Sequence, residues 1–173
     1  LGVAWYGPKG GYLEAVYFDQ KIEDEIFFDL VDFSGYLQSS GETTSSGVEL
    51  IGEVSLLDSL LLSANYTYND TEAADGSARV YRPKHLANLG LLWRGLGERL
   101  ALGGGVRISH DARDIDGSAL DDYEVVHLSG SFLITGGLEV YGRVENALDE
   151  DYQEIPPYNT SGAAAYAGVR YSF

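Results

Sequence analysis

The strongest constraint on the fold is a two-residue alternation of side chains that returns in segment after segment of the chain. In the final segment, Arg170 and Ser172 share one face with small residues, whereas the opposite face is apolar or aromatic: Ala163, Ala165, Ala167, Val169, Tyr171 and Phe173. Side chains of a β-strand alternate between its two faces. The same alternation recurs along the chain, as in residues 60–68, 100–108 and 126–134, and no stretch has a helical period. The sequence therefore predicts an all-β fold.

The alternating segments are separated by connections that are short and long in strict turn. Nine antiparallel strands are expected, at residues 1–6, 12–28, 36–56, 60–68, 84–94, 99–109, 123–135, from 138 onward and 163–173. The first short connection, Gly7-Pro8-Lys9-Gly10-Gly11, reads as a tight turn because Pro fixes φ and Gly admits positive φ. Short turns on one side and long loops on the other are typical of transmembrane barrels.

Aromatic residues near the expected strand ends support the same interpretation. Interfacial girdles of Tyr and Trp mark the two water boundaries of membrane barrels. The predicted girdle residues are Trp5, Tyr6, Tyr66, Tyr68, Trp93, Tyr123, Tyr171 and Phe173. We therefore expect an antiparallel transmembrane β-barrel segment of about nine strands with its apolar face toward lipid. Bacterial single-chain barrels have even strand numbers, so an odd count predicts the later part of a longer barrel.

Five stretches resemble the barrel of TonB-dependent outer-membrane receptors. They are residues 41–50, 81–85, 146–152 (NALDEDY), 157–162 (PYNTSG) and 170–173 (RYSF). The resemblance implies a barrel of about 22 strands with a plugged lumen. Residues 1–173 would be the C-terminal part of that barrel, with the plug domain absent from the sequence shown.

The resemblance also implies a function and a set of partners. The function is transport across the outer membrane of a Gram-negative bacterium, for a bulky ligand such as cobalamin or a ferric siderophore. Energy would arrive from the TonB complex through the missing plug. Outer-membrane lipid and lipopolysaccharide would surround the barrel, and the barrel-insertion machinery would read Val169, Tyr171 and Phe173. The resemblance implies neither an enzyme nor a cofactor.

Two other classes of protein remain open from the residues alone. One is a small structural or adhesive outer-membrane barrel without a plug. The other is a soluble acidic β-sandwich that serves as a binding module, in which the apolar faces would turn inward. The coding sequence upstream of Leu1 separates the first alternative from a receptor, and solubility without detergent would support the second.

The charge of the chain restricts its partners. The formal net charge is −16, which argues against a nucleic-acid partner because such proteins carry a basic footprint. Twenty of the 27 acidic residues fall at 19–32, 70–75, 111–124 and 145–154, in or beside the long connections. One end of the molecule is therefore expected to be strongly negative. A loose divalent-cation site on these loops, able to bridge lipopolysaccharide phosphates, stays open.

No defined metal or catalytic site is expected. The chain has no Cys, which excludes a cysteine-based zinc site. His85, His110 and His127 are scattered in sequence, and no nucleophile-elbow pattern accompanies the many Ser and Asp residues. The run that begins at Asp114 opens like a calcium loop but has Val125 where the twelfth position needs a Glu.

The candidate ligand-binding residues lie in the long loops. Arg offers a rigid fork of donors to ligand oxygens, and Tyr offers contact area at low entropic cost. We therefore select Arg82, Arg113, Tyr152 and Tyr158. On the polar face of the wall, a charge network is expected among Arg107, Arg143, Arg170, Glu49, Glu53, Glu139 and Glu145.

Overall fold

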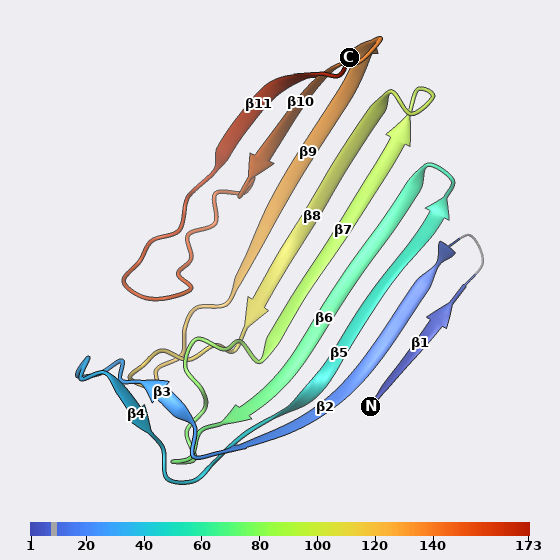
Figure 1. The fold of residues 1–173 in the computed structure, drawn as a ribbon. Helices are drawn as coiled ribbons and strands as arrows, with labels where there is room; N and C mark the ends of the chain where they lie inside the picture. Colours follow the sequence, from blue (N-terminus) through green and yellow to red (C-terminus); the bar gives the residue numbers. More distant parts are fainter. Residues whose placement is uncertain (8–9) are drawn as a thin grey trace.

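A single antiparallel sheet dominates the computed structural model, which describes residues 1–7 and 10–173. Within those residues, nine strands pair in the order β1-β2-β5-β6-β7-β8-β9-β10-β11 (Figure 1). Their bounds are β1 (Gly2–Tyr6), β2 (Tyr12–Glu23), β5 (Glu42–Leu57), β6 (Leu60–Glu72), β7 (His85–Gly95), β8 (Leu100–His110), β9 (Tyr123–Thr135), β10 (Leu138–Glu145) and β11 (Ala164–Tyr171). The all-β, antiparallel prediction is confirmed. Of the tight turn expected at residues 7–11, Pro8 and Lys9 lie outside the described residues.

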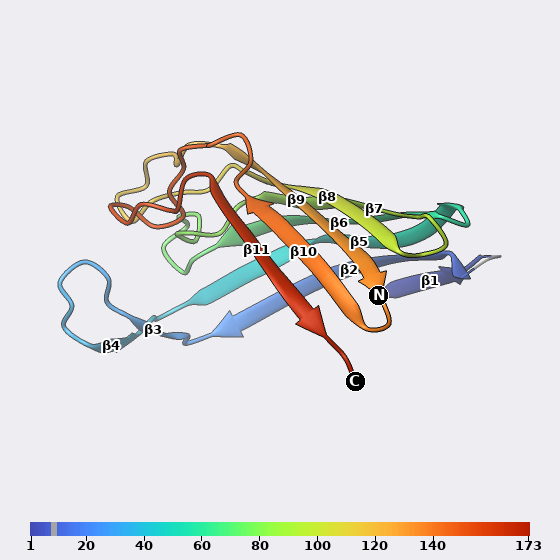
Figure 2. The ribbon, with the colours of Figure 1, turned by 90° about the horizontal axis from the view of Figure 1, so that it is seen from above.

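The sheet is curved and open, with β1 and β11 as its two edges (Figure 2). Each pair of neighbouring strands is antiparallel, so the connections gather alternately at two ends. The short turns lie at one end, and the long connections lie together at the other (Figure 1). We refer to the nine paired strands as the strand wall and to residues 24–41, 73–84, 111–122 and 146–163 as the loop end.

One prediction about the strands was wrong. Strands expected at residues 12–28 and 36–56 are each interrupted, and a separate hairpin of β3 (Ile26–Phe28) and β4 (Tyr36–Gln38) stands between them. The cause lies at Asp24, whose φ of 53° is left-handed and breaks the extended chain. The Asp24 N–H donates to the Gly41 carbonyl at 3.1 Å, which closes the base of the hairpin.

The two faces of the strand wall differ as the alternation predicts. On one face, Leu89 pairs with Ala64 and Val106 in the neighbouring strands. On the other, Asn88 pairs with Asn65 and Arg107. The apolar side chains are exposed, since nothing in the described part of the chain covers them: they include Leu13, Leu50, Leu89, Leu91, Trp93, Leu102, Leu128 and Val169.

Two residues of the predicted aromatic girdle lie on the polar face instead. Tyr6 pairs with Tyr12, and their ring centroids are 5.3 Å apart. Tyr123 is only 6% exposed, and Val125 on the same face is 2% exposed. These two residues of β9 are the buried apolar core in the described residues, and they lie where the β10–β11 connection approaches the wall. Among residues 1–7 and 10–173, no helix is both long and apolar enough to cross a membrane.

Candidate functional site

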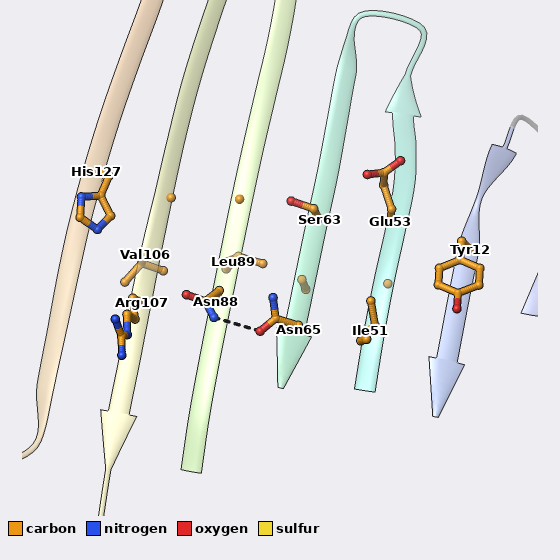
Figure 3. A pocket seen from close by; sticks show the side chains of 14 residues that line it. Tyr12, Ile51, Glu53, Ser63, Asn65, Asn88, Leu89, Val106, Arg107 and His127 are labelled. Carbon is orange, nitrogen blue, oxygen red and sulfur yellow. Dashed lines mark hydrogen bonds between the residues drawn. The ribbon is translucent and has the colours of Figure 1, made fainter. Parts of the chain in front are cut away.

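The polar face of the strand wall contains a hollow of about 590 Å³. It extends across six strands, from Tyr12 in β2 to His127 in β9 (Figure 3). Within it, Asn88 Nδ2 donates to Asn65 Oδ1 at 2.9 Å. Gly90 and Gly105 pair across β7 and β8, and a Cβ added at Gly90 would lie 2.8 Å from the Ser63 hydroxyl. The glycines therefore keep this part of the wall open.

Arginine ion pairs line the polar face beside the hollow. Arg170 pairs with Glu139 at 3.0 Å across β10 and β11, and Arg143 pairs with Glu145 at 3.2 Å. Arg107 differs from the prediction, because its partner at 3.1 Å is Glu154 of the β10–β11 connection. In the part of the chain that the structure describes, Glu49 and Glu53 take part in no ion pair. The charge network thus joins a loop to the wall.

The β10–β11 connection, residues 146–163, is held by the side chain of Asn146. This residue is 3% exposed. Its Nδ2 donates to the carbonyls of Glu150 at 2.8 Å and Ser161 at 3.2 Å, and its Oδ1 accepts from the Glu150 N–H at 2.8 Å. Asp149 Oδ1 accepts from the Ala163 N–H at 2.7 Å. Asn146 therefore ties both ends of the connection together beside β9.

The two candidate tyrosines of this connection have different surroundings. The Tyr152 ring lies against the Tyr123 ring with 4.3 Å between centroids, so it faces the polar side of the wall. The Tyr123 hydroxyl donates to Glu154 at 3.2 Å, which adds to the same contact. Tyr158, in contrast, is 74% exposed. Tyr152 is thus placed as a packing residue, and Tyr158 is presented at the surface.

Arg82 and Arg113 belong to two connections that touch each other. The Tyr81 N–H donates to the Arg113 carbonyl at 2.8 Å, and the Tyr81 hydroxyl donates to Asp114 at 2.8 Å. That hydrogen bond to an ionised acceptor raises the pKa of Tyr81 above its ordinary value. Arg82 lines a second cavity, of about 700 Å³, between the β3–β4 hairpin and the β6–β7 connection. Arg113 is exposed and does not line that cavity.

Three loop carboxylates are held in their ionised form by short-range donors. The Ser34 hydroxyl, with the N–H groups of Asp32 and Val31, lowers the pKa of Asp29 to about 2. The hydroxyl and N–H of Ser77 lower the pKa of Asp75, and those of Ser118 lower the pKa of Asp116. These acids therefore remain charged, and the fold collects them at the loop end, as the charge distribution predicts.

The histidines do not assemble a metal centre. His85 and His110 are directly paired across β7 and β8, but His85 Nδ1 shares a hydrogen bond of 2.8 Å with the Tyr66 hydroxyl. His127 lies apart, in the hollow of the polar wall (Figure 3). Within residues 1–7 and 10–173, no group of three or more His, Asp or Glu residues is arranged to hold a metal ion.

The predicted insertion residues are all exposed at the β11 edge. Val169 pairs with Val140, and Tyr171 pairs with Leu138, on the apolar face. The rings of Tyr171 and Phe173 are stacked with 6.3 Å between centroids. Phe173 is fully exposed. Their exposure leaves these side chains accessible to another protein.

Sequence reasoning missed the residues that the loop end brings together. Phe27, Phe28 and Ser39 line the second cavity. The sequence predicts instead that residues 26–28 end a long strand that begins at residue 12, whereas they form the separate strand β3. The available signal was the acidic, aromatic composition of residues 24–41, which fits a folded loop better than a membrane strand. Glu154 was one acid of a cluster, and nothing in its spacing indicated Arg107.

Comparison with known proteins gives a consistent family. A family model described as "TonB dependent receptor-like, beta-barrel" matches residues 1–147. Over 54 residues, 31% of this chain and 9% of the relative, the sequence is 37% identical to the vitamin B12 transporter BtuB of Photobacterium profundum.

Solved structures show the same fold at low identity. The siderophore receptor PiuA from Acinetobacter baumannii superposes with a TM-score of 0.78 and 20% identity over 98% of this chain and 27% of that one. The ferripyoverdine receptor of the Pseudomonas aeruginosa outer membrane, bound to ferripyoverdine, superposes with a TM-score of 0.81 and 18% identity over 99% of this chain and 26% of that one. The copper transporter OprC superposes with a TM-score of 0.81 and 19% identity over 99% of this chain and 30% of that one. This chain spans less than a third of each of these structures.

Proposed function

Because this chain belongs to the TonB-dependent receptor β-barrel family, we propose that it forms part of an outer-membrane receptor that takes up a bulky ligand with energy from the TonB complex. The family match over residues 1–147 carries this proposal. The strand wall supports it, since an apolar outer face fits lipid and a polar inner face fits a lumen. The remaining strands and the plug would come from residues outside this sequence.

The proposed ligand is a corrinoid or a ferric siderophore. Support comes from similar proteins, which include a vitamin B12 transporter, a siderophore receptor and a ferripyoverdine receptor. A copper transporter among the similar folds shows that the fold alone does not select the ligand. The ligand would meet the loop end first, and Arg82, Arg113, Tyr152 and Tyr158 are its proposed contacts.

Membrane assembly is the second part of the proposal. Val169, Tyr171 and Phe173 form the proposed signal for the barrel-insertion machinery of a Gram-negative bacterium. Deleting Phe173 from the full-length protein should leave the chain in the periplasm and lower its amount in the outer membrane. Normal surface levels of the truncated protein, measured by surface labelling, would contradict this role.

Uptake by the full-length protein tests the receptor function. Cells that express it should accumulate labelled cyanocobalamin or one of a panel of ferric siderophores, and an uncoupler of the proton-motive force should abolish that uptake. Two double variants are compared. One is Arg82→Ala with Arg113→Ala at the loop end, and the other is Arg94→Ala with Arg99→Ala at the opposite end of the strand wall, where the short turns lie. The first double variant should weaken ligand binding and the second should not. Accumulation that survives the uncoupler for every ligand rejects TonB-coupled transport.

A further inference from the structure

The cavity between the β3–β4 hairpin and the β6–β7 connection is distinct from the hollow of the strand wall. Its volume is about 700 Å³. Its lining includes Phe27 and Phe28 from the hairpin and Val80 and Tyr81 from the connection. Small-molecule sites in proteins are concave, mostly apolar and about 300–1,000 Å³ in volume, with few polar groups. The cavity matches that description.

The acidic groups of the cavity already have donors. Glu25 Oε1 accepts from Arg79 at 2.6 Å, and both side chains are largely buried. Asp75 Oδ1 accepts from the Ser77 N–H at 3.0 Å and from its hydroxyl at 2.6 Å. Arg82, by contrast, makes no side-chain hydrogen bond or ion pair with any residue in the ranges 1–7 and 10–173. Arg82 is therefore a cation of the lining whose hydrogen-bond donors are free to meet an anion.

A buried hydroxyl provides an independent indication of a ligand. Ser39 is a lining residue of the cavity, and its Oγ atom is buried and has no hydrogen-bond partner among the residues that the structure describes. Buried polar atoms in native proteins are almost always hydrogen-bonded, so such an exception needs an explanation. A ligand oxygen in the cavity would give this hydroxyl its partner.

We propose that this cavity binds a planar aromatic group that carries a single carboxylate. The ring would lie beside the aromatic lining residues, and the carboxylate oxygens would accept from Arg82 and Ser39, because a guanidinium fork and a hydroxyl both donate to a carboxylate. The excess of carboxylates elsewhere at the loop end repels multiply charged anions, which favours one negative charge. The inference deepens the proposed function and rests on it, since it names the chemical group that this receptor would recognise.

Binding of 2-naphthoate to the purified full-length protein tests the site. In isothermal titration calorimetry in detergent, 2-naphthoate should bind at least tenfold more tightly than the uncharged 2-naphthamide. Arg82→Ala should remove that difference and leave 2-naphthamide binding within about twofold. Ser39→Ala should weaken 2-naphthoate binding about two- to tenfold, the effect expected of one hydrogen bond. Arg94→Ala is the matched control, because Arg94 is an exposed arginine of β7 outside the cavity lining, and it should change the binding of neither ligand.

A second variant separates the cavity from binding elsewhere on the protein. Ala78→Trp should fill the space and abolish 2-naphthoate binding, while circular dichroism shows the same barrel as wild type. The site is overturned if 2-naphthoate and 2-naphthamide bind with equal affinity, or if 2-naphthoate binding is unchanged in Arg82→Ala or Ala78→Trp. None of these outcomes contradicts the uptake proposal, because the titration measures binding alone and needs no energy source. Loss of uncoupler-sensitive uptake with normal 2-naphthoate binding would instead reject the transport function alone.

Discussion

The strand wall and the loop end of this chain are held in different ways. In the wall, ladders of backbone hydrogen bonds join each strand to its neighbours, and the side chains form two continuous faces. At the loop end, single side chains fix the backbone, as Asp29 does in the β3–β4 hairpin and Asn146 does in the β10–β11 connection. The wall therefore depends on a repeated pattern, whereas the loop end depends on individual residues.

This difference separates two kinds of sensitivity to mutation. A substitution in the strand wall should change the free energy of unfolding by an amount that depends on the face it alters, because the apolar face is expected to meet lipid and the polar face water. A substitution at the loop end should change local stability by an amount that depends on the hydrogen bonds that are lost.

The largest effect should come from a charge on the apolar face of the wall. Leu128 is 49% exposed on that face, in the middle of β9. Leu128→Arg should reduce the free energy of unfolding by about 2–4 kcal/mol if the residue lies near the bilayer midplane. The measurement is a urea titration of the full-length protein refolded in lipid vesicles.

The neighbouring residue supplies the matched control. Ser129 lies on the polar face of the same strand, where it pairs with Gly103 and Arg143. Ser129→Arg should change the free energy of unfolding by less than about 1 kcal/mol, as most surface substitutions do. Equal destabilisation by the two arginines would contradict the assignment of the faces.

A smaller effect is expected from Asn146, whose side chain makes three hydrogen bonds to the backbone of the loop end. Asn146→Ala leaves the Glu150 N–H and the carbonyls of Glu150 and Ser161 without their side-chain partner. The cost should be about 1–3 kcal/mol, because unsatisfied buried polar groups are expensive. Hydrogen exchange should accelerate in residues 146–163 while β9 and β10 retain their protection.

Asn159→Ala is the control for Asn146→Ala. Asn159 is exposed, and its side chain accepts only from Gln153, at 2.7 Å, among the hydrogen bonds of the described residues. Its substitution should leave exchange in the connection nearly unchanged. Equal acceleration by both variants would show that the connection is not held by Asn146 in particular.

The same difference explains which parts of the structure could be predicted from the sequence. The nine strands of the wall follow from alternation alone, because a strand with one apolar and one polar face repeats every two residues. The break at Asp24 escaped prediction although three acids in succession, Glu23, Asp24 and Glu25, interrupt the alternation there. The left-handed backbone at Asp24 does not itself follow from a two-residue period. Tyr123 was expected at the lipid boundary, but its position in β9 places it on the polar face.

The candidate site shows the same limit. Arg82 was selected for its chemistry and its loop, and it does line a cavity. The facing wall, with Phe27 and Ser39, comes from a hairpin far away in sequence. Such a cavity depends on how two loops pack, and neither loop has a periodic pattern that would predict it. The roles of Arg82, Arg113, Tyr152 and Tyr158 in ligand contact stay predictions.

The ion pair between Arg107 and Glu154 tests the junction of the two regions. Its atoms are 3.1 Å apart, and both side chains are partly exposed. Exposed pairs of this kind contribute about 0.2–1 kcal/mol, and salt screens them. In a double-mutant cycle with Arg107→Ala and Glu154→Ala, the coupling energy should fall in that range at low salt and diminish in about 1 M NaCl. A coupling that is zero at low salt would mean that the loop is held without this pair.

The effect that reaches the fewest residues should be confined to the β3–β4 hairpin and should depend on pH. The donors from Ser34, Asp32 and Val31 lower the pKa of Asp29 from 3.8 to about 2, so folding favours the ionised carboxylate. A group whose pKa is lowered by folding contributes stability above its unfolded pKa and loses it as the pH falls through the folded value. The protection of the Val31 and Asp32 amides against exchange, relative to the intrinsic rate at each pH, should therefore fall between about pH 4 and pH 2. Asp29→Asn should show fast exchange already at neutral pH and lose most of the pH dependence, whereas Asp58→Asn, in the turn between β5 and β6, should behave as wild type. A hairpin whose exchange is unchanged by Asp29→Asn would show that backbone pairing of β3 with β4 suffices, and that this part of the loop end is built like the wall.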